Sequence, residues 1–357
     1  MNMDLQKEAQ RIVDEAVSSG REHSVQFCAY RDGECIIDVF AGKKDFTTSE
    51  KVDNHTLFPV YSTSKTVPAT GLCRLIAQGK ITAETSVRDY WKEFAVNGKE
   101  NTLLLHLLNH SSGLPQRFPE QKTYEFVADW QSMIHVIENC KPDWVPGTKT
   151  RYQSLTYGWV TAETIQRVTG MSFRDYAQKE LFEPAGIKDF IFGLTEEDEK
   201  RTADFQVEPG KKPGVHPEIP TICDTLEDLM HAPQIRKAAL PGFNGFASAR
   251  GLAEFYNAIL SNMYFDRAML QDATTSRCPE QYEENALSMF GHGYQLLNQD
   301  KSDRGQIFGH HGYGGSGGAA DRKRNIAVGF TTSYLGYHPC KLQLFELAGL
   351  TGHPAGI

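Results

Sequence analysis

Ser62 and Lys65 are the first residues in the chain whose types and spacing could do chemistry. They follow an extended segment over 56–60 and open a predicted helix that continues over 66–78. Residues three apart on a helix share one face, so the lysine lies one turn from the serine hydroxyl. A lysine partly withdrawn from water has a lowered pKa and can act as the base that a serine nucleophile needs. The pair therefore predicts a nucleophilic serine, and the alternative is an N-cap serine beside a solvated lysine.

A second candidate element is the segment Tyr152-Gln153-Ser154, which follows the turn-forming pair Pro146-Gly147. It precedes a predicted helix over 157–168. A buried tyrosine near a lysine ammonium can be held as phenolate or share its proton, and it then serves as a general base. The alternative is a core tyrosine whose hydroxyl is satisfied by a hydrogen bond.

The third element is the glycine-rich run over 309–318, which contains His310, Gly312 and Tyr313. Glycines let a strand edge approach a ligand closely and expose backbone N–H groups, as an oxyanion hole requires. The glycines also fit the spacing of a dinucleotide fingerprint. That interpretation fails because residues 321–324 lead into a strand, so no helix can receive a pyrophosphate and too little chain remains for a second βαβ unit.

The order Ser-x-x-Lys, Tyr-x-Ser, His-x-Gly resembles the serine β-lactamase and penicillin-binding-protein superfamily. In particular, the chain looks like the class C β-lactamase-related serine hydrolases of this superfamily, which include the family VIII carboxylesterases. Other segments resemble the same family and extend the likeness over roughly residues 25 to 335: residues 107–115, Pro146-Gly147 and residues 181–187. The resemblance implies an α+β, β-lactamase/transpeptidase-like fold. In that fold a central antiparallel sheet is flanked by N- and C-terminal helices and carries a mostly helical insert.

Carried over residue by residue, the resemblance assigns the catalytic roles to Ser62, Lys65 and Tyr152. Ser62 is the acylated nucleophile, and Lys65 takes and relays its proton. Tyr152 is the base that, with Lys65, activates the serine and later the incoming water or alcohol. The backbone N–H groups of Ser62 and Tyr313 form the oxyanion hole. Further substrate contacts fall on Ser154, His310 and Gly312.

Two positions depart from the family pattern. Ser154 stands where an asparagine is usual, and a serine is shorter and offers fewer donors. His310 replaces the lysine of the Lys-Thr-Gly strand, with Gly312 at its glycine, which removes a permanent cation that would meet the carboxylate of a β-lactam. Both changes favour esters over β-lactams and peptides.

The residues and the resemblance together predict a serine hydrolase that cleaves carboxylic esters through an acyl-serine intermediate. We expect a small-molecule ester or acyl substrate and no cofactor or metal. Three alternatives stay open: a transesterase or acyltransferase of natural-product metabolism, a β-lactamase or D-amino-acid peptidase, and a catalytically silent binding protein. The intact trio Ser62, Lys65 and Tyr152 argues against the last.

Composition and charge restrict the binding partners and the cellular compartment that we expect for this chain. The net charge is −8, so the chain lacks the basic surface that nucleic acid or anionic lipid requires. Residues 1–8 lack a basic region followed by an apolar run, and no later stretch approaches a membrane span. The seven cysteines are scattered and contain no C-x-x-C pair, which suits free thiols in a reducing compartment. We therefore expect a cytoplasmic protein that binds neither nucleic acid nor membrane.

Three histidines outside the motifs invite a metal interpretation. His106 and His110 are four apart on a predicted helix, but they lack the glutamate of a zinc protease. Histidines that bind the loop backbone are the favoured interpretation. His292 stands alone between two glycines, and we expect it at the surface or in a cleft.

The elements that position these residues alternate in type along the chain. The N-terminal part predicts a helix over 3–18 and a hairpin of strands 25–30 and 35–40, joined at an Asp-Gly turn. The C-terminal part predicts strands over 293–297, 306–309 and 325–333. A final helix there carries an apolar stripe of Leu342, Phe345 and Leu350.

The two ends of the chain are predicted to share one antiparallel sheet. We assign residues 1–75 and 241–357 to this α/β sheet subdomain and residues 76–240 to a helical insert, the whole forming one catalytic unit. Substrate preference is expected from the stretches over 115–145 and 200–240. Pro68 falls in the helix after Ser62 and predicts irregular first turns.

Overall fold

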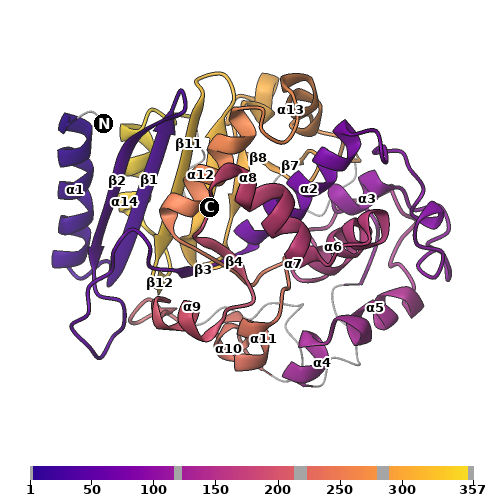
Figure 1. The fold of residues 1–357 in the computed structure, drawn as a ribbon, viewed down its shortest axis with the longest axis horizontal. Helices are drawn as coiled ribbons and strands as arrows, with labels where there is room; N and C mark the ends of the chain where they lie inside the picture. Colours follow the sequence, from indigo (N-terminus) through magenta and orange to yellow (C-terminus); the bar gives the residue numbers. More distant parts are fainter. Residues whose placement is uncertain (1–2, 116–122, 213–222, 280–288, 353–357) are drawn as a thin grey trace.

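A seven-stranded antiparallel sheet runs through the centre of the computed structural model, which describes residues 3–115, 123–212, 223–279 and 289–352 (Figure 1). The strand order is β2-β1-β11-β10-β9-β8-β7. Strands from the two ends of the chain are therefore neighbours at β1 and β11, as the sequence predicts. The strands of this sheet are β1 (Ser24–Arg31), β2 (Glu34–Gly42), β7 (Met289–Phe290), β8 (Gln295–Leu296), β9 (Ile307–His311), β10 (Gly317–Asp321) and β11 (Ile326–Thr332).

The β1–β2 hairpin confirms the Asp-Gly prediction. Asp32 has a φ of 52° and Gly33 a φ of 84°, the positive values that a two-residue turn between twisted strands requires. Side chains alternate along β1. Phe27 consequently joins the core beneath the terminal helices, whereas Cys28 faces the other side of the sheet.

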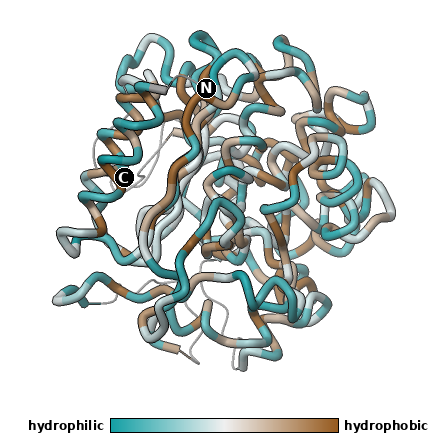
Figure 2. Tube along the Cα trace, turned by 60° about the vertical axis from the view of Figure 1, so that its left-hand side comes forward, coloured by the Kyte–Doolittle hydropathy of each residue, from teal (hydrophilic) through white to brown (hydrophobic). Residues whose placement is uncertain are grey.

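Helices cover both faces of the sheet. On one face α1 (Met3–Ser18) and α14 (Pro339–Leu347) pack together, and Ile12, Val13 and Phe345 lie in one core with residues of β1, β2 and β11. On the other face α12 (Ala249–Leu260) packs on β1, β10 and β11. Figure 2 shows the amphipathic pattern, since outer helices alternate teal and brown while the strands they cover are mostly white and brown. These terminal helices were predicted.

The remaining helices gather beside the sheet, together with two small sheets, β3-β6-β4 and β12-β5. Their strands are β3 (Phe58–Tyr61), β4 (Phe190–Phe192), β5 (Gln206–Val207), β6 (Gly245–Ala247) and β12 (Tyr334–Leu335). The helices are α2 (Thr66–Ala77), α3 (Leu104–Leu108), α4 (Tyr124–Ala128), α5 (Trp130–Asn139), α6 (Thr156–Thr169), α7 (Phe173–Tyr176), α8 (Glu183–Ala185), α9 (Glu196–Lys200), α10 (Leu226–His231), α11 (Pro233–Lys237) and α13 (Arg267–Ala273).

Several segments bear on the predicted division of the chain. The regular structure described within 76–240 is helical apart from β4 and β5, and its separation as a subdomain stays a prediction. Parts of the two stretches expected to set substrate preference, 116–122 and 213–222, lie outside the described residues. None of the helices in the described ranges combines the length and apolarity needed to cross a membrane.

Candidate active site

Ser62 stands at a sharp corner between a strand and a helix. Strand β3 ends at Tyr61, whose φ of 43° lies in the left-handed region that non-glycine residues rarely adopt. A 3-10 turn over Ser62–Lys65 follows and runs directly into α2. This irregular start agrees with the expectation drawn from Pro68. A backbone held in such a conformation costs about 1–3 kcal/mol, so neighbouring contacts must fix it.

Buried hydrogen bonds supply those contacts. The Ser64 hydroxyl donates to the Tyr61 carbonyl and accepts from the backbone N–H of Gly245 at 2.9 Å. The Thr63 hydroxyl donates to the carbonyl of His310 at 3.1 Å. The corner is thereby tied to both β6 and β9, and His310 is brought next to the serine turn.

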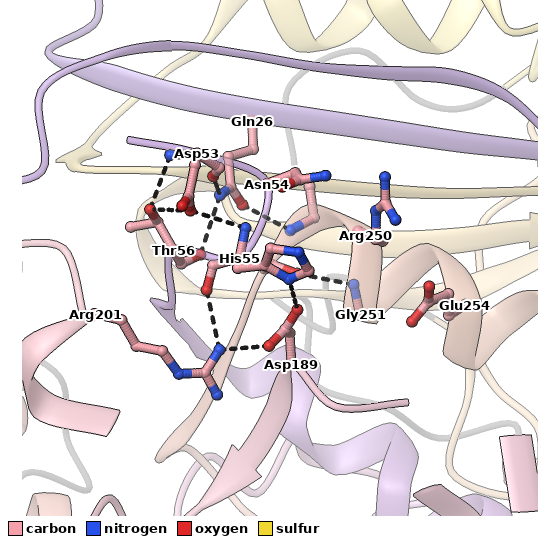
Figure 3. Close-up of polar contacts among 12 residues, drawn as sticks. Gln26, Asp53, Asn54, His55, Thr56, Asp189, Arg201, Arg250, Gly251 and Glu254 are labelled. Carbon is pink, nitrogen blue, oxygen red and sulfur yellow. Dashed lines mark hydrogen bonds and ion pairs between the residues drawn. The ribbon is translucent and has the colours of Figure 1, made fainter. Parts of the chain in front are cut away.

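The segment that leads into β3 is anchored to the main sheet (Figure 3). The buried Gln26 amide donates to the carbonyls of Asp53 and Thr56, the latter at 3.0 Å. The Gln26 oxygen accepts from the Ala249 backbone N–H at 2.8 Å and the Thr331 hydroxyl at 2.9 Å. One side chain therefore joins the approach to Ser62 to β11 and to the start of α12.

An ionic cluster fixes the same approach from the other side (Figure 3). The carboxylate of Asp189 is buried and lies 2.7 Å from His55 Nδ1, and the Arg201 guanidinium pairs with its other oxygen. Arg201 also donates to the His55 carbonyl at 3.1 Å. The cluster joins the residues before β4 and after α9 to the nucleophile strand.

The Lys65 side chain is fully buried, and oxygen acceptors surround its ammonium nitrogen. Nζ lies 3.0 Å from Ser62 Oγ and 2.5 Å from the Ser154 carbonyl oxygen, and it also donates to the carbonyl of Gly242. Three acceptors match the three N–H donors of an ammonium group. Nζ also stands 5.1 Å from the centroid of the Tyr152 ring. The structure thus places the first two predicted elements in one site.

The Gly242 carbonyl has no counterpart among the predicted residues. It reaches Lys65 because two backbones touch there: a Cβ on Gly158, in the first turn of α6, would lie 2.0 Å from Gly242 N. Backbone acceptors carry no side-chain pattern, so no motif in the sequence identifies this contact. In the sequence, this contact is reflected only in the two glycines, Gly158 and Gly242, that let the backbones approach so closely.

Tyr152 lies in an aromatic pocket. Its ring stacks on Phe290 with a centroid distance of 5.9 Å and an interplanar angle of 9°. The rings of His110 and His310 lie 5.0 Å and 5.9 Å away. The third predicted element therefore joins the first two, because His310 borders the same tyrosine. Sequence reasoning missed Phe290 as a wall of the site.

His310 is a neutral imidazole at physiological pH. Burial and the nearby Lys65 charge lower its pKa to about 3. Its Nδ1 lies 2.7 Å from the carbonyl oxygen of His311, which can only accept, so Nδ1 carries the proton and Nε2 the lone pair. The site thus holds an acceptor where the family pattern has a cation.

His106 and His110 support the interpretation of backbone-binding histidines. His106 Nδ1 accepts from the Leu103 N–H and His110 Nδ1 from the Gln153 N–H, each at 3.1 Å. Burial, Lys65 and His310 lower the pKa of His110 well below its usual value. No group of three or more potential ligand residues occurs among the described residues. His110 therefore acts as a neutral support for the segment that carries Tyr152.

The expectation for His292 was wrong, because this residue is completely buried. Its backbone N–H donates to the Ala273 carbonyl at 2.8 Å, and burial lowers the pKa of its imidazole. The flanking glycines allow close packing rather than exposure: a Cβ on Gly291 would lie 2.0 Å from the Ala273 oxygen.

The glycine-rich turn after β9 packs against the Ser62 corner. A Cβ on Gly312 would lie 2.3 Å from the Val60 carbonyl oxygen, so only glycine fits there. The Tyr313 ring packs edge-on against Tyr61 with centroids 5.4 Å apart. Gly312 and Tyr313 thus adjoin the nucleophile strand, as their predicted roles require.

Comparison with known proteins decides the family. A family model described as beta-lactamase matches residues 9–352. The chain belongs to the beta-lactamase family. It is 26% identical over 327 residues to an esterase/beta-lactamase, LipL, of Mycobacterium tuberculosis, a match that covers 84% of this chain and 74% of that protein.

Solved structures of the family share the fold. A penicillin-binding protein homologue from Caulobacter crescentus superposes with a TM-score of 0.85 at 24% identity, and a family VIII carboxylesterase with 0.84 at 24%. Each match covers 97% of both chains. Both the predicted resemblance and the predicted β-lactamase/transpeptidase-like fold are confirmed. The chain is a hydrolase of the serine beta-lactamase fold, and the roles of its individual residues are a matter for proposal.

Proposed function

We propose that this chain hydrolyses small carboxylic esters through an acyl-Ser62 intermediate. The observation that carries the proposal is the buried Lys65 ammonium, 3.0 Å from Ser62 Oγ and held by two backbone carbonyls. Because all three N–H donors are engaged, Lys65 donates to the serine oxygen rather than accepting its proton. The base then falls to Tyr152, whose phenolate the neighbouring ammonium stabilises.

Acylation follows from this arrangement. Tyr152 takes the hydroxyl proton of Ser62 while Oγ forms a bond to the ester carbonyl carbon and the carbonyl π electrons move to oxygen. The resulting oxyanion accepts hydrogen bonds from the backbone N–H groups of Ser62 and Tyr313. When the intermediate collapses, the bond to the alkoxide oxygen breaks, and the alkoxide leaves with the proton from Tyr152.

Deacylation reverses these roles. Water gives a proton to Tyr152 and attacks the acyl carbon, and a second oxyanion forms in the same place. Its collapse breaks the bond to Ser62 Oγ, which recovers the proton. An alcohol that enters instead of water would carry out acyl transfer by the same steps.

The charge in the site supports esters over β-lactams. The imidazole of His310 is neutral near pH 7, so the strand that would meet a substrate carboxylate offers no cation there. Ser154 contributes its backbone carbonyl to Lys65, and its hydroxyl is a shorter donor than the usual asparagine amide. Neither change removes a contact that binding of an uncharged ester requires.

The test is a panel of short and medium p-nitrophenyl esters beside a chromogenic cephalosporin, run on the wild type and on Ser62→Ala. We expect steady ester turnover that vanishes in Ser62→Ala, with cephalosporin hydrolysis at least about 100-fold slower, as the loss of one charge-assisted contact would give. Cephalosporin turnover equal to that of the best ester would refute the preference. A stoichiometric burst without turnover would replace hydrolysis by acyl transfer.

A further inference from the structure

The two adjacent histidines of β9 serve different sides of the sheet. Side chains alternate along a strand, so His310 faces the serine and His311 faces the opposite way. Nδ1 of His311 lies 3.1 Å from the ammonium nitrogen of Lys341, which α14 supplies from the opposite layer. Both residues are almost completely buried. A second polar cluster thus lies directly behind the candidate active site.

Lys341 also binds the glycine-rich turn. Its Nζ donates to the Gly315 carbonyl at 2.9 Å, and it lies 5.9 Å and 5.6 Å from the ring centroids of Phe330 and Phe345. A buried lysine is costly, and burial lowers the pKa of this one to about 7. Charged or neutral, the amine keeps N–H groups to donate. An apolar side chain of similar length would fill the space more cheaply but could not hold the carbonyl.

His338, one turn before Lys341, holds the neighbouring carbonyl. Its Nε2 lies 2.8 Å from the Gly314 oxygen, and its Nδ1 lies 2.6 Å from the buried carboxylate of Glu22. The Thr332 hydroxyl donates to the other oxygen of Glu22 at 2.8 Å. The Glu22 carboxylate and the Gly314 carbonyl can only accept, so the ring donates from both nitrogens and forms a buried ion pair with Glu22.

The turn is therefore clamped from two sides. Its front contacts the nucleophile strand at Gly312, as described above, and its back is held at the two carbonyls that follow Tyr313. No Cβ could be accommodated at Gly315, because it would lie 2.1 Å from the ring of His338. Within the turn, Gly312 N–H donates to the Ser316 carbonyl at 2.7 Å.

We infer that Lys341 and His338 are positioning residues for the reaction, which hold the turn so that the Tyr313 N–H stays directed at the oxyanion. This inference deepens the proposed function and rests on it. Neither side chain touches the substrate. Their effect is transmitted through the carbonyls of Gly314 and Gly315, one and two residues beyond the donor.

The experiment compares Lys341→Met with Lys341→Gln in the full chain. Methionine keeps the length and loses the donors, whereas glutamine keeps an N–H for the Gly315 carbonyl. With a p-nitrophenyl ester, we expect kcat of Lys341→Met to fall about 10- to 100-fold while KM changes less than about threefold, since displaced oxyanion donors weaken the transition state alone. Lys341→Gln should recover most of the loss.

Lys99→Met is the matched control. Lys99 is also fully buried and donates to two backbone carbonyls, those of Glu138 and Cys140, but it lies in the helical part away from the turn. It should lose thermal stability as Lys341→Met does and keep its kcat. A wild-type kcat in a folded Lys341→Met, or an equal kcat loss in Lys99→Met, would overturn the inference.

Two further measurements keep the test decisive. His338→Phe removes the contact to the Gly314 carbonyl, and we expect the same split between kcat and KM, so the inference can be judged if Lys341→Met does not fold. The rate at which a fluorophosphonate labels Ser62 also needs the oxyanion donors but no ester specificity. Slower labelling in the Lys341→Met and His338→Phe variants supports the inference even where the wild type turns over no ester, and unchanged labelling refutes it.

Discussion

Charge is concentrated on a single group in the candidate active site. Lys65 is buried among acceptors, and its field together with burial keeps the imidazoles of His110 and His310 neutral. Because these imidazoles are neutral, the Lys65 charge is the one cation among them, and it favours the ionised form of an acid that lies beside it. The Tyr152 ring lies beside that cation, with its centroid 5.1 Å from Lys65 Nζ. In the mechanism we propose, this arrangement assigns the role of base to the phenol rather than to the lysine.

Removal of the Tyr152 hydroxyl alone should strongly slow ester hydrolysis. In Tyr152→Phe the ring still stacks on Phe290, so we expect an unchanged melting temperature and a kcat/KM lowered about 100- to 10,000-fold, the range for a general base. The matched control is Tyr157→Phe. The buried ring of Tyr157 stacks on the ring of His110, with centroids 4.6 Å apart. The Tyr157 hydroxyl has no hydrogen-bond partner in the described part of the chain. Tyr157→Phe should keep full ester turnover; an equal loss in both variants would show that the tyrosine hydroxyls act through packing.

At the scale of single residues, the sequence predicts which side chains form the candidate active site better than it predicts which backbone atoms do. Ser62 and Lys65 could be paired because a helix brings residues three apart together whatever surrounds it. Tyr152 and His310 needed the family resemblance to join them. The Gly242 carbonyl and the ring of Phe290 could not be predicted, since each reaches the site through tertiary packing that no local spacing encodes.

At the scale of elements, the nucleophile depends on a strained corner that distant segments hold in place. The φ of Tyr61 is tolerated because β6, β9 and the segment before β3 are each fixed by buried hydrogen bonds. Gln26 is the most connected of these anchors. It lies on β1 and reaches three other parts of the chain with one amide.

Gln26→Leu should therefore destabilise the fold and weaken catalysis together. The substitution leaves buried backbone groups of Thr56 and Ala249 without partners, and we expect the free energy of unfolding to fall by about 2–4 kcal/mol. Urea unfolding measures this loss, and ester kinetics should show a lower kcat as the corner loosens. Gln343→Leu, on the exposed face of α14, serves as the control and should stay within about 0.5 kcal/mol of the wild type. A Gln26→Leu variant as stable as that control would contradict the role of the anchor.

The predicted elements were correct where local patterns are strong and failed where packing decides. The helix over 3–18 and the hairpin at Asp32-Gly33 follow from periodicity and turn chemistry. Strand β10 was missed because its Gly-Gly-Ala-Ala-Asp sequence has little β propensity. It is a central strand because small residues fit beneath α12, where a Cβ on Gly318 would lie 2.2 Å from the Tyr256 ring.

At the scale of the whole molecule, the site and its supports bury several basic groups. Burial lowers the pKa of His106, His110, His292 and His310 and of Lys341. The folded state consequently binds fewer protons than the unfolded chain as the pH falls below the usual histidine pKa of about 6.5. Glu254 and Glu227 work in the opposite direction, since burial raises the pKa of both carboxyls, that of Glu254 to about 7. The four histidines and Lys341 outnumber these two acids.

Stability should therefore fall with acidification before the carboxylates titrate. A histidine with a folded pKa near 3 contributes stability that is fully present above about pH 6.5 and is lost as the pH falls towards 3. Between pH 7 and pH 5, one such group removes about 2 kcal/mol. Urea unfolding across this range should show the decline, and His310→Gln should flatten it by about that amount. His135→Gln changes an exposed histidine and should leave the wild-type slope, so equal slopes for wild type and His310→Gln would show that His310 titrates normally in the folded protein.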